Sequence, residues 1–514
     1  MTTTKQIQVS KNELDKVQYL TEVLPEIPTN TILYKKLTGL GATYGEITAK
    51  RNSIIIEPNV PVIIGKCNDP KHKDDNLFGV YEGVYTDDIV NYLEKSKKKY
   101  YKILTTPESF QKVKDAFEEL EMSAHCSCFL LFDECHKLVK DADYRNNITL
   151  PIDDFFKFDQ KALVSATPIE LNDPRFKEQN FKMIEIQPTF DYKKELWLHH
   201  TNNTLQALKT VLSKLDNEEA APLPICVFIN STDIIYSLMK QLDLLEDSAV
   251  FCAPKSVDKL KKNRFCNVYE EWNKDKMKRY NFFTSRFFNA VDMELEEQPH
   301  VIMLTDVYFA EHTMIDPYTD AIQIVGRFRN GVSSITYISN TKKGLPQRSK
   351  EEIKGYLICS KEIYRTMKNF YDCATDRASR DAYRAALESL PFNRMLDRNG
   401  RENWFAIDNY MDEELMKNYF YDENSLYKAY DNCDSFIVYH AGYYCPLGDS
   451  ERLKRENKSQ SIKDKRKEIV RQLEMLGDCV TEMELEYKRD LIAADSFIVE
   501  AYDTVGKEVI EKLK

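Results

Sequence analysis

Two series of short apolar runs, separated by charged stretches, constrain the fold of this chain more than any other feature of its sequence. The runs are three to five residues long and rich in β-branched or aromatic residues. Such runs are typical of parallel strands that helices cover on both faces. The first series is Thr31–Tyr34, Ser53–Ile56, Ile103–Thr105, Phe129–Phe132 and Ala162–Val164, and the second is Ile225–Ile229, Ala249–Cys252, Asn281–Thr284, Val301–Leu304 and Ile335–Ile338. We therefore predict an α/β protein with two parallel sheets joined near residues 187–200.

The length of 514 residues implies several domains, because a single hydrophobic core does not grow to that size. From about residue 346 the strand signals give way to long charged segments. We predict a first α/β domain over residues 1–190, a second over residues 191–345 and a mainly helical C-terminal extension over residues 346–514. Residues 404–444 are dense in aromatic side chains, which favours a helical core over a base-stacking surface.

The net charge of −11 excludes a protein that is basic over its whole surface, but it is compatible with a local basic track. Basic residues gather at residues 94–102 and at residues 452–472, where nine Lys or Arg stand against three acids. Each run fits a solvated helix face, and the second also fits a phosphate backbone or a protein partner. Residues 452–514 as a whole predict an antiparallel pair of long charged helices.

Targeting and cysteine signals favour an intracellular, cytoplasmic protein without a membrane partner. No apolar run approaches the roughly 20 residues of a membrane helix, and the polar N-terminus lacks a signal core. The twelve cysteines show no disulfide spacing, so we expect reduced thiols. A zinc site is disfavoured although Cys126, Cys128, Cys135, His125 and His136 lie close in sequence. Much of that segment reads as a buried strand, whose side chains alternate between faces.

The strongest chemical signal is a pair of adjacent acids at the carboxyl end of an apolar strand, Phe132-Asp133-Glu134-Cys135-His136. Open α/β sheets place their ligands at this end of their strands. One carboxylate can hold Mg²⁺ through its water shell, and its neighbour can orient an attacking water.

Three further segments surround this pair along the chain. A second strand ends in the hydroxyl residues of Ser165-Ala166-Thr167. A glycine-rich turn, Thr38-Gly39-Leu40-Gly41-Ala42-Thr43, can present backbone N–H groups to phosphates. The segment Gln323-Ile324-Val325-Gly326-Arg327-Phe328-Arg329 supplies arginines that can stabilise charge on a γ-phosphate.

In this order, the segments resemble the motif series of superfamily 2 helicases over about residues 28–345. Motif I corresponds to Thr38–Thr43, motif II to the acidic pair with His136, motif III to Ser165–Thr167 and motif VI to Gln323–Arg329. Less specific matches are motif Ia at Ile54–Asn59, Ib at Thr105–Glu108, IV at Val227–Ser231 and V at Thr284–Asp292. The resemblance implies two tandem RecA-like domains that hydrolyse ATP with Mg²⁺ and act on nucleic acid.

The resemblance also implies roles for single residues. The catalytic set is Asp133, Glu134, Gln323, Arg327 and Arg329, with Thr43 and Asp133 on the metal. The nucleotide-binding set is Lys36, Thr38, Gly39, Leu40, Gly41, Ala42 and Thr43. Coupling of the site to nucleic acid falls to His136, Ser165, Thr167 and Asp292, and contact with nucleic acid to Pro58, Thr106 and Thr284.

Motif I departs from the family pattern, because Ala42 stands where the family has lysine before the hydroxyl residue. That lysine meets the β- and γ-phosphates, and a methyl group cannot replace its charge. Three explanations are open. Lys35 or Lys36 reaches the site in place of the missing lysine, another basic group does so, or the site binds nucleotide poorly. Because the acids and arginines are all kept, we favour activity. In lacking that lysine, the loop resembles that of some helicase-like proteins of bacteriophages and mobile elements.

Smaller departures concern the substrate. Ala290 replaces a glycine of motif V, and Gln18 is a poor candidate for an adenine-reading glutamine. Arg329 stands one place earlier than in DEAD-box proteins, a spacing closer to viral origin-binding and repair-type DNA helicases. We expect an ATP-dependent helicase or translocase acting on DNA. The alternatives are an RNA helicase or remodeller, a helicase-fold nucleic-acid-binding or assembly protein without turnover, and the motor subunit of a nuclease complex.

Overall fold

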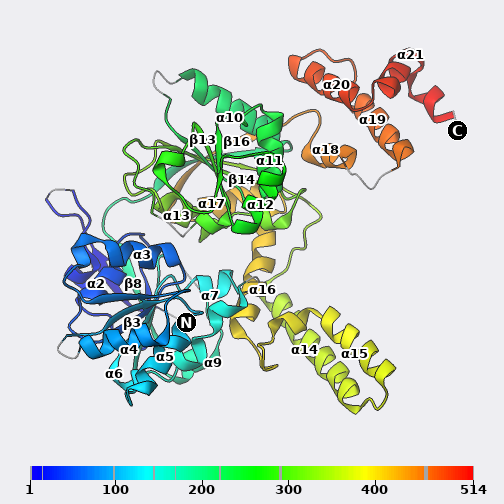
Figure 1. The fold of residues 1–514 in the computed structure, drawn as a ribbon. Helices are drawn as coiled ribbons and strands as arrows, with labels where there is room; N and C mark the ends of the chain where they lie inside the picture. Colours follow the sequence, from blue (N-terminus) through cyan, green and yellow to red (C-terminus); the bar gives the residue numbers. More distant parts are fainter. Residues whose placement is uncertain are drawn as a thin grey trace.

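Two parallel sheets with helices on both faces form the body of the molecule, one above the other in Figure 1. The structure, a computed structural model, describes residues 3–512 except 14, 97–98, 143–144, 168–169, 219–221, 289–291 and 457–460. Within these ranges each sheet has eight strands, and all pairings between the named strands are parallel. The predicted fold class, two tandem RecA-like domains with a mainly helical C-terminal extension, is confirmed.

The first sheet lies in the domain drawn in blue and cyan. In spatial order its strands are β1 (Thr3–Val9), β8 (Lys182–Pro188), β2 (Thr31–Tyr34), β7 (Gln160–Ser165), β6 (Phe129–Phe132), β3 (Ser53–Ile56), β5 (Lys102–Thr105) and β4 (Leu77–Val80). The connected helices are α1 (Leu20–Val23), α2 (Ala42–Thr48), α3 (Val60–Asn68), α4 (Thr86–Lys95), α5 (Phe110–Glu119), α6 (Ala124–Ser127), α7 (Lys137–Lys140), α8 (Ile152–Phe155) and α9 (Pro174–Glu178).

The middle of each central strand is apolar because both faces of the sheet are buried. In β6, Leu130 and Phe132 join the core under α4 and α5, whereas Phe129 and Leu131 join the core under α1, α2 and α3. Successive strand residues point to opposite faces, so a strand covered on both sides favours apolar residues at consecutive positions.

The second sheet carries an edge strand from far along the chain. Its order is β12 (Val268–Tyr269), β11 (Ser248–Phe251), β13 (Tyr280–Phe283), β10 (Ile225–Phe228), β14 (His300–Thr305), β15 (Ser334–Ser339), β9 (Lys194–Thr201) and β16 (Phe436–Tyr443). The chain enters this sheet from the first through residues 189–193. The helices α10 (Thr204–Glu218), α11 (Thr232–Gln241) and α12 (Pro254–Lys262) cover one face, and α13 (Asp320–Gly326) lies on the other.

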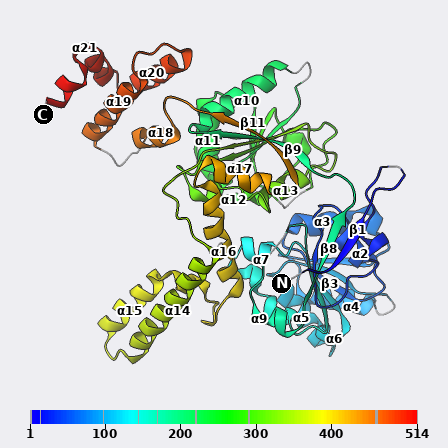
Figure 2. The same ribbon diagram turned by 180° about the vertical axis from the view of Figure 1, so that it is seen from behind.

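Between β15 and β16 the chain forms a helical insertion, drawn in yellow. It comprises α14 (Lys350–Cys373), α15 (Arg377–Ser389), α16 (Trp404–Lys417) and α17 (Glu423–Asp431). Figure 2 shows α14 and α15 projecting as a hairpin beside the first domain, while α16 runs along the junction of the two domains. The aromatic residues of this region are largely core. Phe405 packs into the first domain, and Phe420, Tyr430 and Phe436 pack under the second sheet.

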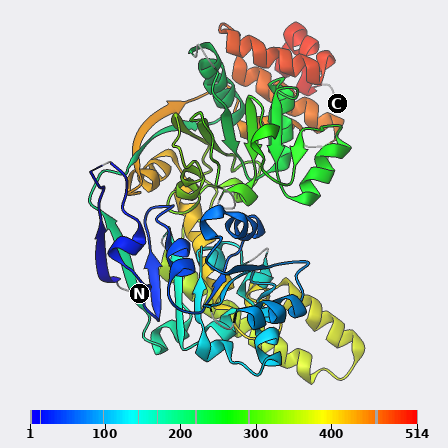
Figure 3. The ribbon, with the colours of Figure 1, turned by 60° about the vertical axis from the view of Figure 1, so that its left-hand side comes forward.

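The last part of the chain is a separate helical lobe beyond the second domain, drawn in orange and red in Figure 3. It comprises α18 (Asp449–Glu456), α19 (Ile462–Leu476), α20 (Glu482–Ala494) and α21 (Ser496–Lys512). The predicted antiparallel pair was wrong, because α19, α20 and α21 all pack on one another around Leu473, Leu491 and Val499. Among the described residues, no helix combines the length and the apolar character that a bilayer crossing requires.

Sequence patterns missed the edge strands β1, β4, β12 and β16, and also β8 and β9, each of which lies next to an edge strand. These strands alternate polar and apolar residues or are short, unlike the fully buried central ones. In β9, for example, Leu196 and Leu198 are buried and Trp197 between them is exposed. Pro168 after motif III and Ala290 in motif V lie outside the described residues.

Candidate active site

The residues singled out by the sequence converge on the carboxyl edge of the first sheet. There β2, β7 and β6 are neighbours, and they end at Tyr34, Ser165 and Phe132. The strand order therefore brings together the glycine loop after β2, the Ser-Ala-Thr segment after β7 and the acidic pair after β6. This edge is the ligand side of an open α/β sheet.

Asp133 and Glu134 are fixed by short local contacts. Asp133 is 3% exposed and accepts a hydrogen bond from Thr43 Oγ1 at the start of α2. The backbone N–H of Glu134 donates to Asp133 Oδ1 at 2.9 Å. Glu134 has a φ of +48°, in the left-handed region that residues with a Cβ rarely adopt. Such a conformation costs of the order of 1 kcal/mol and persists only where the surroundings enforce it.

Of the two lysines that follow β2, Lys35 reaches the acids and Lys36 does not. Lys35 is 5% exposed, and its Nζ lies 3.9 Å from Asp133 Oδ1 and 4.0 Å from Glu134 Oε1. Lys36 turns to β8, where its Nζ lies 2.9 Å from Glu185 Oε1 and donates to Gln187 Oε1. The structure thus places Lys36, which the sequence assigned to the nucleotide, away from the acidic pair.

The charge of Glu134 is set by the basic groups around it. Burial by itself would raise the pKa of this carboxyl. The Lys35 ammonium opposes burial most strongly, followed by His136 and Arg327, and together they hold the pKa of Glu134 well below its usual range. Glu134 is therefore ionised at neutral pH and can accept a hydrogen bond from water.

Glu57 is a third carboxyl at this edge that sequence reasoning did not assign. Ile56 pairs with Phe132, so the next residues on β3 and β6 are Glu57 and Asp133. Burial, and then the charges of Asp133 and Glu134, raise the pKa of Glu57 to about 8. The signal that could have indicated Glu57 in the sequence is its position directly after β3, the strand that pairs with the strand of motif II.

His136, Ser165 and Thr167 form a chain of contacts behind the acidic pair. His136 Nδ1 lies 3.3 Å from Glu134 Oε2 and 3.2 Å from Ser165 Oγ. Ser165 Oγ in turn accepts a hydrogen bond from the backbone N–H of Thr167 at 3.1 Å. Motifs II and III are therefore joined by direct side-chain contacts.

The second domain contributes the opposite wall of the site. Gln323 and Arg327 of the α13 region are 1% and 5% exposed, and Gln323 Nε2 lies 3.5 Å from Glu134 Oε2. Arg327 donates to Gln323 Oε1 at 2.9 Å. Asp292 of motif V lies 3.3 Å from Arg327 Nη1 and 2.7 Å from Arg329 Nη2, so it holds both arginines at the cleft.

The glycine loop of the first domain faces these arginines closely. Gly39 and Gly41 have φ values of +76° and +80°, which glycine adopts without strain. A Cβ on Gly39 would lie 2.5 Å from Arg329 Nη1, and one on Gly326 would lie 2.6 Å from Thr38 side-chain atoms. Ala42, at 2% exposure, begins α2. Leu40, predicted to contact nucleotide, is a core residue whose carbonyl accepts from Leu20 N–H.

The residues expected to contact nucleic acid follow other strands, at the carboxyl edges of the two sheets. Pro58 follows β3, Thr106 follows β5, and Thr284 follows β13 of the second sheet. All three are buried: the Pro58 carbonyl accepts from Arg145 Nη1, and Thr106 Oγ1 accepts from Ser109 N–H. Gln18 is taken up locally, since its Oε1 accepts from Ser10 N–H and Oγ.

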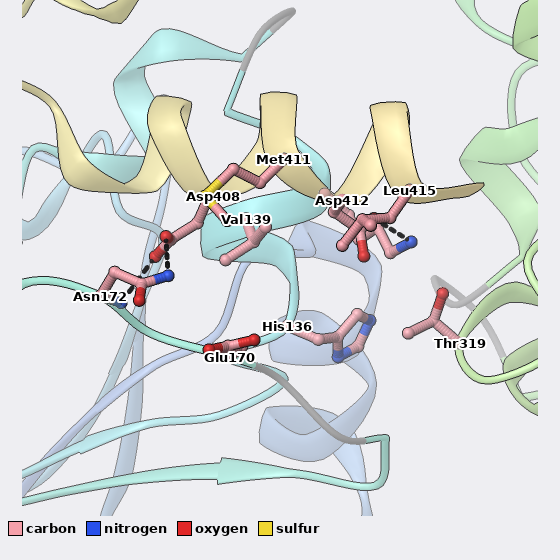
Figure 4. A pocket seen from close by; sticks show the side chains of 10 residues that line it. His136, Val139, Glu170, Asn172, Thr319, Asp408, Met411, Asp412 and Leu415 are labelled. Carbon is pink, nitrogen blue, oxygen red and sulfur yellow. Dashed lines mark hydrogen bonds and ion pairs between the residues drawn. The ribbon is translucent and has the colours of Figure 1, made fainter. Parts of the chain in front are cut away.

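Helix α16 joins the two domains beside the site, at a position that no sequence motif indicated. Lys140 of α7 reaches Asp316 of the second domain and Asp412 of α16, each at 2.6 Å. Asp408, one turn earlier on α16, accepts from Asn172 of the first domain at 2.7 and 3.0 Å (Figure 4). We call Lys140, Asp316 and Asp412 the clasp. It flanks a cavity of about 80 Å³ that is also lined by His136 and Thr319.

Thr43 and Asp133 offer a hydroxyl and a carboxylate oxygen at one point, as a hydrated magnesium ion between protein and phosphates requires. Among the described residues there is no group of three or more His, Cys, Asp or Glu side chains arranged to hold a metal by themselves. The residues present therefore fit a metal that is shared with a bound phosphate group.

No protein-family model matches the sequence, and neither does any of the curated proteins compared with it. Among solved structures, Saccharomyces cerevisiae Dbp5 bound to RNA and ADP BeF3 is similar at 13% identity over 76% of this chain and 90% of that one, with a TM-score of 0.38. Mycobacterium smegmatis helicase Lhr bound to ssDNA and AMP-PNP matches at 12% identity over 71% and 52% (TM-score 0.38). The Pyrococcus furiosus Hef helicase domain matches at 10% over 61% and 92% (TM-score 0.37).

Proposed function

We propose that this protein is an ATP-driven helicase or translocase of the superfamily 2 type that acts on nucleic acid, with DNA as the favoured substrate. Asp133 and Thr43 would hold Mg²⁺, which neutralises phosphate charge. Glu134 would orient the attacking water. Gln323, Arg327 and Arg329 would close the site from the second domain.

The approach of Arg329 to Gly39 carries this proposal. An arginine of one domain lies against the glycine loop of the other, where a Cβ on Gly39 would be 2.5 Å from its guanidinium. Phosphates cradled by that loop would meet the guanidinium directly. Arginines supplied in this way from a second domain accelerate phosphoryl transfer by about 10³–10⁵-fold. Binding of ATP would draw the domains together, and hydrolysis would release them.

Nucleic acid would lie along the carboxyl edges of both sheets, past Pro58, Thr106 and Thr284. The contacts of His136 with Glu134 and Ser165 support coupling between this track and the hydrolytic site. The spacing of Arg327 and Arg329 favours DNA over RNA. The lobe of α18 to α21, with its basic start, is a candidate surface for a protein partner.

Hydrolysis of ATP by the full chain with Mg²⁺ tests the proposal. It should be measured alone and with single-stranded DNA, duplex DNA or RNA, with Glu134→Gln as the control. We expect turnover that nucleic acid stimulates and that falls at least about 100-fold in the variant. The best stimulator identifies the substrate class, and stimulation by RNA alone would identify an RNA remodeller.

Ala42 favours one other function, that of a nucleic-acid-binding or assembly protein without turnover. Wild type and Glu134→Gln would then be equally inactive under every condition, while nucleic acid would still bind. That outcome would refute the motor and leave a scaffold.

A further inference from the structure

Lys35 is a buried cation that the protein itself leaves without a close partner. Its side chain is 6% exposed, and its nearest carboxylates lie 3.9 and 4.0 Å away. Among the described residues, no acceptor lies within hydrogen-bonding distance of its Nζ. An ammonium group carries three donors, and a buried one is stable only with anionic or hydrogen-bonding partners. Its donors are thus available to a ligand.

The backbone fixes where this ammonium lies. Lys35 follows β2 directly, and its N–H donates to the carbonyl of Ser165 on β7 at 2.8 Å. The glycine loop starts three residues later, and Thr43 at its end contacts Asp133. Lys35 Nζ is therefore held between the loop and the acidic pair.

The groups around this point are arranged for an anion. From the second domain, the guanidinium of Arg329 lies against Gly39 of the glycine loop, and Arg327 acts on the same carboxylate, Glu134, as Lys35 does. Ala42 adds no charge. Asp133 and Glu134 lie beside the ammonium, where a metal ion and a water would separate them from phosphate.

We infer that Lys35 supplies the phosphate contact that Ala42 cannot make, so that the lysine of the site comes from the strand before the glycine loop. The inference rests on the proposed ATPase function. Lys35 contacts the terminal phosphates of the nucleotide when the site is filled. Lys36, although adjacent, plays no part because Glu185 holds it at β8.

The experiment compares two lysine variants of the full chain. Lys35→Met keeps the aliphatic stem and removes the charge, and Lys36→Met is the matched neighbour. Binding of AMP-PNP and of ADP with Mg²⁺ is measured by titration calorimetry, together with kcat for ATP. We expect Lys35→Met to lower kcat about 100-fold and to abolish any preference for AMP-PNP over ADP. Lys36→Met should change each value less than about threefold.

A second variant separates the charge from the fold. In Lys35→Met/Ala42→Lys the lysine returns at the motif I position, and we expect much of the lost binding and turnover to return. Melting temperatures establish that all variants are folded. The inference is overturned if Lys35→Met keeps wild-type binding and turnover, if Lys36→Met loses as much, or if the folded double variant stays as inactive as Lys35→Met.

The outcome is distinguishable from failure of the proposed function. A wild type that hydrolyses ATP but does not depend on Lys35 refutes this inference alone. A wild type that binds AMP-PNP through Lys35 without hydrolysing ATP refutes the motor and supports the inference. Absence of nucleotide binding by the wild type refutes both.

Discussion

The two domains meet at the cleft of the candidate active site and at the clasp, and the contacts differ in kind. Across the cleft, the contacts of Gln323 with Glu134 and of Thr38 with Gly326 are both 3.5 Å long. At the clasp, Lys140 reaches two carboxylates at 2.6 Å. The contacts across the cleft are at the outer limit of a hydrogen bond, whereas short charged contacts fix a position. The comparison teaches that the strongest polar contacts between the domains lie beside the site and not within it.

The clasp differs from the cleft because the helical insertion contributes to it. Asp412 belongs to α16, so the clasp has a third member that neither sheet supplies. The insertion also reaches the first domain through Arg401, whose Nη2 lies 2.8 Å from Asp153. Closure of the cleft is therefore expected to pivot about α16.

Among the changes that test this comparison, removal of a cleft arginine should have the largest effect, and the effect should be on kcat. Arg329→Ala is expected to lower kcat about 1,000-fold, because the variant loses the cation that we propose to face the γ-phosphate. Stability should change little, since the ion pair of Arg329 with Asp292 borders solvent, with Asp292 45% exposed. The measurement is steady-state ATP hydrolysis at saturating nucleic acid. Arg264→Ala, at an exposed position of the same domain, is the control, and equal activity of both variants would contradict the role.

Breaking the clasp should cost stability more than chemistry. Lys140→Met leaves Asp316 and Asp412 without their shared cation, and we expect unfolding to become easier by about 3 kcal/mol. Denaturant unfolding gives this value, and X-ray scattering shows whether the domains separate. Lys259→Met breaks an exposed pair with Asp233 and should cost less than about 1 kcal/mol. Similar losses of unfolding free energy in the two variants would mean that the clasp stabilises the protein no more than an exposed ion pair does.

The clasp should also respond to pH through Asp320, which begins α13. Burial, followed by the opposing effects of Lys140 and Asp316, raises the pKa of Asp320 to about 6. Because the pKa of Asp320 is higher in the folded state, its contribution to the free energy of unfolding is greatest below the ordinary pKa of 3.8. This contribution is lost as the pH rises through 6.

Asp320→Asn removes this titration and keeps an acceptor for Asp316 N–H. Between pH 4 and pH 7 the wild type should lose about 2 kcal/mol relative to the variant. Parallel curves of unfolding free energy against pH would contradict the expectation.

A methyl group in the cleft should have the smallest effect. Gly326→Ala places a Cβ 2.6 Å from Thr38, so the domains must shift by a fraction of an ångström. We expect kcat/KM to fall about tenfold without loss of stability. Thr38→Ala in the same chain removes the obstacle and should restore most of the activity. If the double variant stays as slow as the single one, Thr38 itself is needed.

The central strands and the motif edge could be predicted because their signals are local. An apolar run such as Phe129–Phe132 specifies a buried strand, and the acids behind it fall at the carboxyl end whatever follows. The choice between Lys35 and Lys36 could not be predicted. It depends on Glu185 of β8, about 150 residues away, which binds one lysine and leaves the other for the site. The clasp likewise needs three segments that share no sequence pattern.

Strand β16 also has a consequence for how the molecule is made. It pairs with β9 from Phe436 opposite Lys194 to Tyr443 opposite Thr201, after the whole insertion has been synthesised. Contacts so distant in sequence form slowly, because a long loop must close before they gain any free energy. During synthesis, one backbone edge of β9 has no partner strand until β16 has been made. An edge that is exposed in this way can pair with other chains. A shorter protein ending at residue 345 would carry that edge permanently, so we expect the two α/β domains to need β16 as well as the residues up to 345.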